Sequence, residues 1–314
     1  MAVARPQAGR DYPRNWDEFL KLFSTEQDCF DYLERVRWGK GFICPHCGSF
    51  GAAFWRMGDG RRRCKLCRAE TTVTAGTIFH GTRKDLRIWF AAIWHVVNAK
   101  NGASAMTIQR TFGFGSYQTA WAWLHKLRRA MVRPDRDLLR GDVEVDEIFY
   151  GGVKRGGSGG RGAPGKTLVV IAVEDRGKGA GRVRMKRILK ADKPTLHGFI
   201  RSNVVTGSTI ITDGWSHYQG IDKLGYTHAR RVVSGSGKQA HELLPHVHRV
   251  AGLSKRWLLG THQGSWSPEQ LDYYLDEYTF RYNRRRSKLR GVLFYRLIEN
   301  AVVTDPHPYK DLRA

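Results

Sequence analysis

Apolar positions recur at helical spacing through the first part of the chain and change to short β-branched runs further on. Between positions 85 and 98 they form one stripe: Leu86, Trp89, Phe90, Ile93, Trp94 and Val97. This stripe predicts a helix that ends at Asn101-Gly102. A second helix is expected over 104–111, and Ser116 is placed to begin a third that runs to about 131. Because a glycine-bearing turn joins the last two, residues 83–133 predict a helix-turn-helix-like domain, an outline that other helical bundles share.

Beyond position 140 the pattern alternates between strands and helices. Strands are expected at 143–150, 167–174, 182–189, 208–213 and 227–233, and helices at 194–203 and 243–259. Ser267-Pro268-Glu269 is a typical helix start, and the buried face of the helix that follows is expected to consist of Leu271, Leu275, Tyr278 and Tyr282. This order predicts an α/β domain over 140–285, with a mixed sheet compatible with the ribonuclease H topology. Residues 286–314 are expected to form a basic C-terminal tail.

The N-terminal residues 1–40 are expected to hold a basic arm and one short helix. Ser24 and Gln27 match a capping box, and Phe30, Leu33 and Val36 follow at helical spacing. Cys29 falls inside this helix and is expected to be a small core residue.

Four of the five cysteines form two close pairs, Cys44-Pro-His-Cys47 and Cys64-Lys-Leu-Cys67. Two such pairs at this separation match the four-thiolate tetrahedron of a structural Zn²⁺ ribbon, predicted here over 41–80. A redox or iron–sulfur role is the alternative. His46 is an alternative ligand, although four sulfurs already complete the site.

The charge of the chain is strongly positive. Lys and Arg number 53 against 29 Asp and Glu, a formal net charge of +24. This excess predicts a polyanionic partner, by default DNA or RNA, and a ribosomal protein or a basic protein that binds nonspecifically is the alternative. No run of eighteen apolar residues and no signal-peptide pattern is present, so a cytoplasmic, nucleoid-associated protein without a membrane partner is expected.

One glycine-rich stretch imitates a nucleotide-binding loop. Residues 160–167 satisfy the P-loop expression. A P-loop needs a strand before it and a helix after it, whereas a strand pattern follows here. The stretch 151–165 is therefore interpreted as a positively charged flap near Asp146.

Two aspartates stand at the ends of apolar, β-branched runs. Asp146 lies in the run 143–150, and Asp213 ends the run 208–213. A buried carboxylate must be paired, hydrogen-bonded or metal-bound, so two of them can form a site for Mg²⁺ or Mn²⁺. An ordinary strand-end acid and a turn aspartate before Gly214 are the alternative interpretation.

A basic helix edge follows these aspartates. His248 and Lys255 are seven residues apart and share one helix face, and Arg249 and Arg256 repeat that spacing beside them. Together with Asp146 and Asp213 this edge can build a site for two-metal phosphoryl transfer. A solvated basic helix with a core histidine is the alternative.

Taken together, these motifs resemble the zinc-ribbon group of DDE-type insertion-sequence transposases (insertion-sequence family 1595). Nearly the whole chain is covered by the resemblance. Besides the cysteine ribbon, its motifs are Glu144-Val-Asp146-Glu-x-x-x-Gly-Gly152, Thr212-Asp213-Gly-x-x-x-Tyr218, His248-Arg-Val with Leu253-Ser-Lys255-Arg-Trp, and Tyr274-Leu-Asp-Glu-x-x-Phe280-Arg-Tyr-Asn283.

The resemblance implies a transposase that binds terminal inverted repeats, cleaves the 3′ end and joins it to target DNA. In this interpretation Asp146 and Asp213 hold the catalytic cations, His248 is the third ligand or a proton carrier, and Lys255 clamps a phosphate. The residues expected to contact DNA are Lys126, Arg128, Arg129, Arg249 and Arg256. Synapsis of two transposon ends implies at least a dimer. The alternatives are a non-catalytic zinc-containing DNA-binding regulator and a ribonuclease H-type nuclease that does not join strands.

The third acid of the DDE pattern is replaced by His248. Imidazole is a softer, neutral ligand that suits Mn²⁺ better than Mg²⁺. Glu242, Glu269 and Glu277 are reserve candidates for the missing acid. Glu144 and Glu147 compete with Asp146, and Glu144 is expected to support the site from behind, since it shares a strand face with Asp146.

Overall fold

The computed structural model describes residues 6–133, 136–151, 166–232, 236–263 and 266–312. The chain divides into two compact units, residues 1–133 together with 287–314, and residues 134–286. Each unit has its own core and is described separately. No helix among the described residues is long and apolar enough to cross a membrane.

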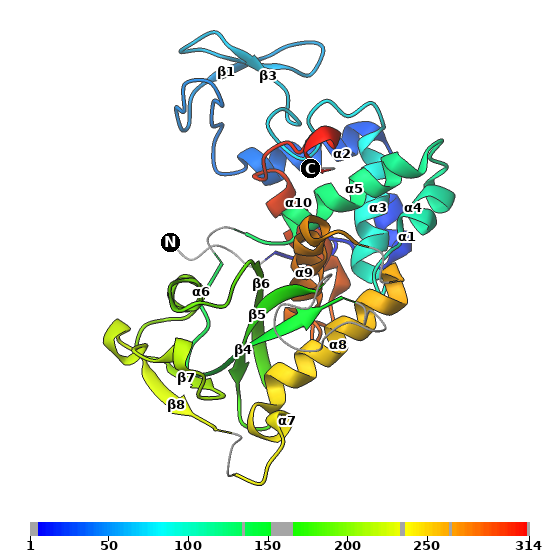
Figure 1. Ribbon diagram of the computed structural model, residues 1–314. Helices are drawn as coiled ribbons and strands as arrows, with labels where there is room; N and C mark the ends of the chain where they lie inside the picture. Colours follow the sequence, from blue (N-terminus) through cyan, green and yellow to red (C-terminus); the bar gives the residue numbers. More distant parts are fainter. Residues whose placement is uncertain (1–5, 134–135, 152–165, 233–235, 264–265, 313–314) are drawn as a thin grey trace. The chain divides into compact units, whose positions relative to one another are not determined.

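The first unit is a helical bundle that carries a small ribbon. Its helices are α1 (Trp16–Leu22), α2 (Glu26–Trp38), α3 (Leu86–Asn98), α4 (Ala105–Phe112), α5 (Tyr117–Ala130), α10 (Arg290–Ala301) and α11 (Tyr309–Leu312) (Figure 1). The ribbon is an antiparallel sheet of β1 (Phe54–Arg56), β2 (Arg62–Cys64) and β3 (Glu70–Thr71). The α4 to α5 turn uses Gly113 in the left-handed region, φ 62°, which ends α4 as the glycine-bearing turn predicted.

Helix α10 corrects the expectation that residues 286–314 form a tail. It contacts α2, α3 and α5, and its Phe294 is fully buried among aromatic rings of the bundle. Leu293, Leu297 and Ile298 are buried beside it at helical spacing. The sequence therefore did carry the pattern, but the basic run before position 290 concealed it.

Smaller differences concern where the helices begin and end. The capping box of α2 is formed by Thr25 and Asp28, one position after the expected pair. Helix α1 was not predicted, and α3 ends at Asn98, before the expected Asn101-Gly102. Cys29 is completely buried in α2, which confirms it as a core residue.

The second unit is built on a five-stranded mixed sheet with the order β6-β5-β4-β7-β8. The strands are β4 (Asp142–Tyr150), β5 (Thr167–Asp175), β6 (Ala180–Ile188), β7 (Thr209–Thr212) and β8 (Thr227–Arg230). Strands β4, β5 and β6 pair antiparallel, whereas β7 and β8 run parallel to β4 and to each other. Three antiparallel strands followed by a helix and parallel strands make the ribonuclease H-like arrangement, so the predicted fold class is confirmed. Residues 152–165, the predicted flap, lie outside the described residues.

Helices cover both faces of this sheet. They are α6 (Lys193–Asn203), the 3-10 turns η1 (Ser216–Tyr218) and η2 (Asp222–Leu224), α7 (Ala240–Leu243), α8 (Pro245–His262) and α9 (Pro268–Asn283). Helices α8 and α9 pack on one face through Val247, Val250 and Leu275, while α6 packs on the other through Leu196 and Ile200 (Figure 1). Alternate residues of β4 therefore face different helices.

Candidate active site and zinc centre

The four paired cysteines converge in the ribbon. Cys44 Sγ lies 3.6 Å from Cys67 Sγ, and Cys47 Sγ lies 4.0 Å from Cys64 Sγ. Each cysteine offers a sulfur within 4.8 Å of the others. Zn–S bonds of about 2.3 Å in a tetrahedron separate the sulfurs by roughly 3.8 Å, so this donor set fits one structural Zn²⁺.

The basic residues around the ribbon are largely paired. Arg62 is buried against Glu34, which also binds Arg56 at 2.9 Å. Glu70 pairs with Arg61 and Arg63. These contacts neutralise much of the positive charge of the arginines that lie between and beside the cysteine pairs.

Strand pairing brings the two predicted aspartates to one edge of the second sheet. Glu144 of β4 pairs with Ile211 of β7 in parallel register. Continuing that register by two residues places Asp213 beside Asp146. The main-chain N–H of Trp215 donates to Asp213 Oδ1 at 3.0 Å, and the N–H of Glu147 donates to Asp146 Oδ1 at 2.8 Å. Both carboxylates are thus held by the backbone that follows them.

The hydroxyl of Tyr218 contacts Glu147 and is also affected by the charges of the two aspartates. Tyr218 is completely buried and donates to Glu147 Oε2 at 2.6 Å. Burial raises the pKa of Tyr218, and the negative charges of Glu147, Asp146 and Asp213 raise it further. All three carboxylates therefore act on the same hydroxyl group.

His248 of α8 faces Asp146, as the sequence predicted. Its Nε2 lies 3.6 Å from Asp146 Oδ2, and the side chains are 30% and 15% exposed. Within the described residues this nitrogen has no hydrogen-bond partner. Burial lowers the pKa of His248, and the nearby charges of His241 and Lys255 lower it further. The lowered pKa favours the neutral imidazole, the form that binds a metal ion.

Asp213 does not join these two residues in a single tight cluster. No group of three ligand atoms within 4.8 Å contains Asp146, Asp213 and His248, although all three residues are described. A site for two cations about 3.5–4 Å apart spreads its ligands more widely than a site for one. Among the described residues, the three predicted ligands therefore do not form a site for a single cation.

The hydrogen bonds between Glu144 and the start of α8 explain why His248 lies close to Asp146. Its side chain is completely buried, and Oε2 accepts the N–H groups of His246 and Val247 at 2.8 and 2.9 Å. The start of α8 is thereby fixed to β4, and two residues further along each element His248 faces Asp146. Burial raises the pKa of Glu144, while the α8 amides counteract part of that rise. The structure thus places Glu144 behind the site, on the strand face that the sequence indicated.

Replacing Glu144 by alanine should loosen this junction. Two amides would lose their acceptor, and a cavity would open in the core, at a cost of about 2–4 kcal/mol. Hydrogen exchange over α8 and calorimetry of the full chain would measure the loss. Glu144→Gln is the matched control, because its amide oxygen still accepts from α8; equal losses in both variants would contradict the capping role.

The other basic residues predicted for the site, Lys255, Arg249 and Arg256, also lie on α8. Lys255 Nζ lies 5.5 Å from the centre of the Tyr150 ring. Burial lowers the pKa of Lys255, and the charge of Lys166 lowers it further. Tyr150 is held by a 2.6 Å hydrogen bond to Ser254. Arg249 and Arg256 are exposed on the same helix.

The reserve acids are engaged elsewhere. Glu277 is buried and pairs with Arg281 at 2.7 Å, and Glu242 accepts from the N–H of Gln239 in the capping box of α7. Glu269 is exposed in the first turn of α9. Glu147, engaged with Tyr218, points to the sheet face opposite Asp146.

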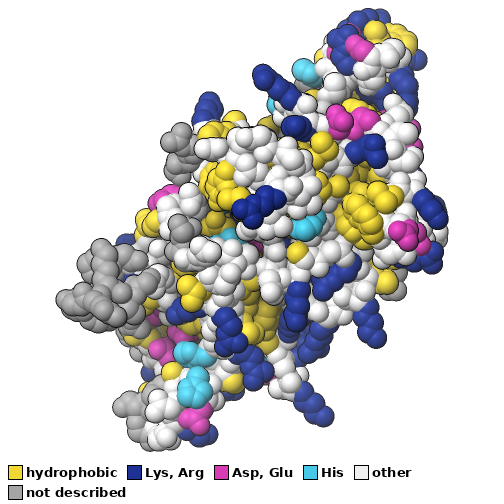
Figure 2. Space-filling view, turned by 90° about the vertical axis from the view of Figure 1, so that its right-hand side faces the viewer, with side chains coloured by type: hydrophobic (Ala, Val, Ile, Leu, Met, Phe, Trp, Pro, Cys, Tyr) yellow, Lys and Arg dark blue, Asp and Glu magenta, His cyan; other side chains and the backbone are white. Residues whose placement is uncertain are grey.

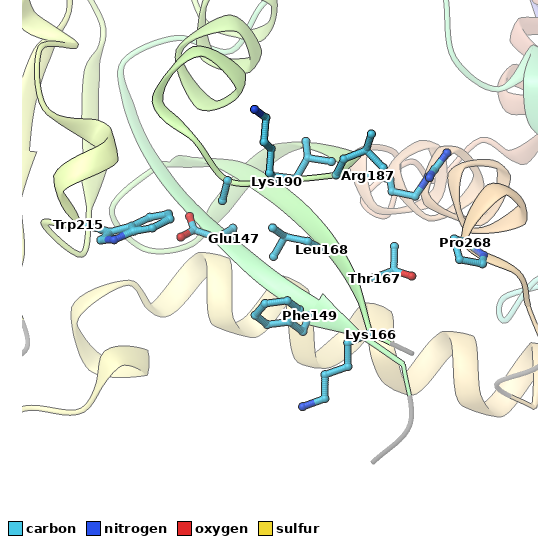
Figure 3. Close-up of a pocket in the computed structure, with 12 residues that line it drawn as sticks. Glu147, Phe149, Lys166, Thr167, Leu168, Arg187, Lys190, Trp215 and Pro268 are labelled. Atoms are coloured by element: carbon cyan, nitrogen blue, oxygen red, sulfur yellow. The ribbon is translucent and has the colours of Figure 1, made fainter. Parts of the chain in front are cut away.

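A cavity of about 420 Å³ lies beside Glu147, and neither Asp146 nor Asp213 is among the residues that line it. Glu147 and Trp215, whose main-chain N–H groups donate to the two aspartates, both line the cavity and lie next to each other in Figure 3. Its other walls include Lys166, Arg187 and Lys190. Sequence reasoning did not identify this cavity, because its lining comes from five separated segments.

The predicted DNA-contacting residues of α5 differ in their exposure to solvent. Arg129 is exposed, and Lys126 is partly exposed. Arg128 is only 2% exposed, so it is not available to a DNA backbone, which corrects the prediction. The reason is helical spacing: position 128 lies one turn from Leu124 on the buried face of α5.

Two domain families match the chain. The ISXO2-like transposase domain matches residues 138–283, and the transposase zinc-ribbon domain matches residues 24–70. Both are domains of IS1595 transposases. The chain belongs to the IS1595 family. This IS1595 protein therefore carries a DDE-type transposase domain and a structural zinc ribbon, as the sequence motifs indicated.

One relative extends over most of the IS1595 protein. It is described as an uncharacterized protein in transposable element ISH50 of Halobacterium salinarum, is 27% identical over 285 residues, and the alignment covers 83% of this chain and 92% of the relative. Among solved structures, a Mos1 transposase paired-end complex with left transposon end matches this chain with 11% sequence identity and a TM-score of 0.25. The match covers 68% of this chain and 81% of the Mos1 chain. The ribonuclease H-like assignment rests on the strand order alone.

Proposed function

We propose that this IS1595 transposase cleaves the 3′ ends of its insertion sequence and joins them to target DNA. Asp146, Asp213 and His248 would hold divalent cations, Mg²⁺ or Mn²⁺. The observation that supports this most directly is the 3.6 Å approach of His248 to Asp146 beside the strand that delivers Asp213. The chemistry that such cations supply is activation of the attacking oxygen and stabilisation of the leaving one.

The protein's own groups have separate tasks in this reaction. The backbone N–H groups hold the carboxylates in place, and neutral His248 offers Nε2 as a ligand. The ammonium group of Lys255, on the same edge of α8, would bind a substrate phosphate. Because no nucleophilic side chain is required, no covalent link between protein and DNA is expected.

DNA binding is assigned to the basic surface and to the helical unit. Figure 2 shows Lys and Arg side chains spread over the visible face, with few Asp and Glu among them. Exposed Arg129 and partly exposed Lys126 of α5 would contact the terminal repeats together with the ribbon. Arg249 and Arg256 would contact DNA near the catalytic residues. Two ends are processed in one synaptic complex, so at least a dimer is expected.

An end-processing assay tests this function against its two rivals. Purified protein is incubated with labelled end fragments, a target plasmid and Mn²⁺. Cleavage followed by joining supports the proposal. Cleavage without joining identifies a nuclease, and sequence-specific end binding without cleavage identifies a DNA-binding regulator.

The choice of metal should depend on His248. Wild-type protein is expected to work better with Mn²⁺ than with Mg²⁺, because imidazole suits the softer ion. Restoring a carboxylate with His248→Glu should raise the ratio of Mg²⁺-supported to Mn²⁺-supported cleavage by about tenfold, the lower end of what ligand surroundings do to metal affinity.

The matched control is His248→Gln, which removes the imidazole without adding charge. It should lower cleavage with both ions, and the Mn²⁺-supported reaction more, because the ligand that suits Mn²⁺ is gone. If neither variant changes the ratio, the imidazole does not select the metal.

A further inference from the structure

A second group of metal-capable side chains lies outside the proposed catalytic set. Glu144 comes from β4, Asp175 ends β5, and His246 lies in the first turn of α8. Each offers one ligand atom, and these atoms all lie within 4.8 Å of one another. In the described part of the chain only the ribbon cysteines form another such group.

The cluster sits in the interior of the second unit. Glu144 is completely buried, His246 is 9% exposed, and the Asp175 side chain is 21% exposed. A buried carboxylate is costly unless its charge is compensated. Two carboxylates within this distance increase that cost, because each disfavours the charge of the other.

Hydrogen bonds satisfy only part of the cluster. Glu144 Oε2 accepts both α8 amides, and His246 Nε2 lies 3.1 Å from Asp175 Oδ1. Glu144 Oε1 and His246 Nδ1 are buried without a hydrogen-bond partner among the described residues. The helix-capping role accounts for one oxygen of Glu144 and leaves the other unexplained.

We propose that Glu144, Asp175 and His246 form a second cation site, which binds a divalent transition-metal ion such as Zn²⁺ or Mn²⁺. An imidazole with two carboxylates suits these ions better than Mg²⁺ or Ca²⁺, which prefer oxygen ligands alone. The ion would compensate both carboxylates and give Glu144 Oε1 a partner. It would also tie β4, β5 and the start of α8 together, and so stabilise the two elements that carry Asp146 and His248.

Metal counting on the full-length chain tests this site without reference to transposition. The parent protein carries Asp146→Asn and Asp213→Asn, which remove the proposed catalytic carboxylates. After loading with Zn²⁺ and dialysis, mass spectrometry of the metal content should find one zinc beyond that of the ribbon. Added Zn²⁺ should also raise the melting temperature of the second unit.

Conservative substitutions separate ligation from structure. Glu144→Gln keeps an acceptor for the α8 amides, and Asp175→Asn keeps a polar partner for His246, but each removes a charged ligand. Added to the parent, either change should abolish the extra zinc and the melting shift. Asp222→Asn, at an exposed acid of the same unit, should leave both intact.

Two outcomes would overturn the site. The parent would hold only the zinc of the ribbon, or both conservative variants would keep the extra ion. Circular dichroism of the metal-free proteins shows whether each variant folds. If Glu144→Gln does not fold, Asp175→Asn alone provides the test. Because no step measures DNA cleavage, failure of this site and failure of the proposed transposase reaction are distinguishable.

Discussion

Asp213→Asn is expected to abolish both cleavage of the transposon end and its joining to target DNA. Asparagine keeps the size of the side chain and its acceptor for the Trp215 N–H, but it removes the negative charge that would hold a cation between β4 and β7. Metal-assisted charge stabilisation contributes several kcal/mol to such a reaction, which corresponds to a rate loss of about a thousandfold or more. Gel analysis of labelled ends with Mn²⁺ measures both steps, and Asp146→Asn should behave alike.

The control for this prediction is a matched change at an exposed acid. Asp222→Asn removes the same charge from the same unit without approaching the strand ends and should leave cleavage unchanged. Binding to end fragments should persist in Asp213→Asn, because the basic surface is intact. Cleavage within tenfold of the wild type in Asp213→Asn would refute the assignment of this residue as a metal ligand.

Loss of the zinc should unfold the ribbon and leave the second unit folded. Cys64→Ser removes one of four thiolates, and Zn²⁺ binding supplies about 10–16 kcal/mol of apparent folding free energy in small zinc modules. The ribbon region offers little other core, since Phe50 before β1 is 69% exposed and Trp55 in β1 is 38% exposed. Zinc content, hydrogen exchange over 41–71 and binding to end fragments should all fall.

Cys29→Ala provides the comparison, because Cys29 is buried in α2 and offers no ligand. Its zinc content and end binding should match the wild type, although its melting temperature should fall. Unchanged hydrogen exchange over 41–71 in Cys64→Ser, or after treatment with a chelator, would show that the ribbon folds without the metal.

Local patterns predicted much of the second unit. The β-branched runs around Asp146 and Asp213 became paired strands, because a short apolar run can bury both faces only inside a sheet. The seven-residue spacing of His248 and Lys255 placed them along one helix. The cysteine spacing predicted the ribbon for a similar reason, since tight turns fix where both sulfurs point.

Long-range packing decided what these patterns did not. Helix α10 was interpreted as part of a tail, because the basic run before position 290 concealed its helical pattern. Only the structure shows that Phe294 packs against Phe23 and Phe90, which lie far away in the sequence. Arg128 was counted as a surface cation, because charge alone does not show which face of α5 is buried. Each error concerns the environment of a residue and not its type.

The order of residues along the chain was sufficient to predict the zinc ligands, the succession of strands and helices in the second unit and the family, because each depends on spacing within short segments. The meeting of Glu144 with the start of α8, the approach of His248 to Asp146 and the buried Glu144, Asp175 and His246 cluster depend on contacts across about seventy to one hundred residues. Such contacts form only when the helix packs on the sheet, since hydrophobic burial and not local spacing determines that docking.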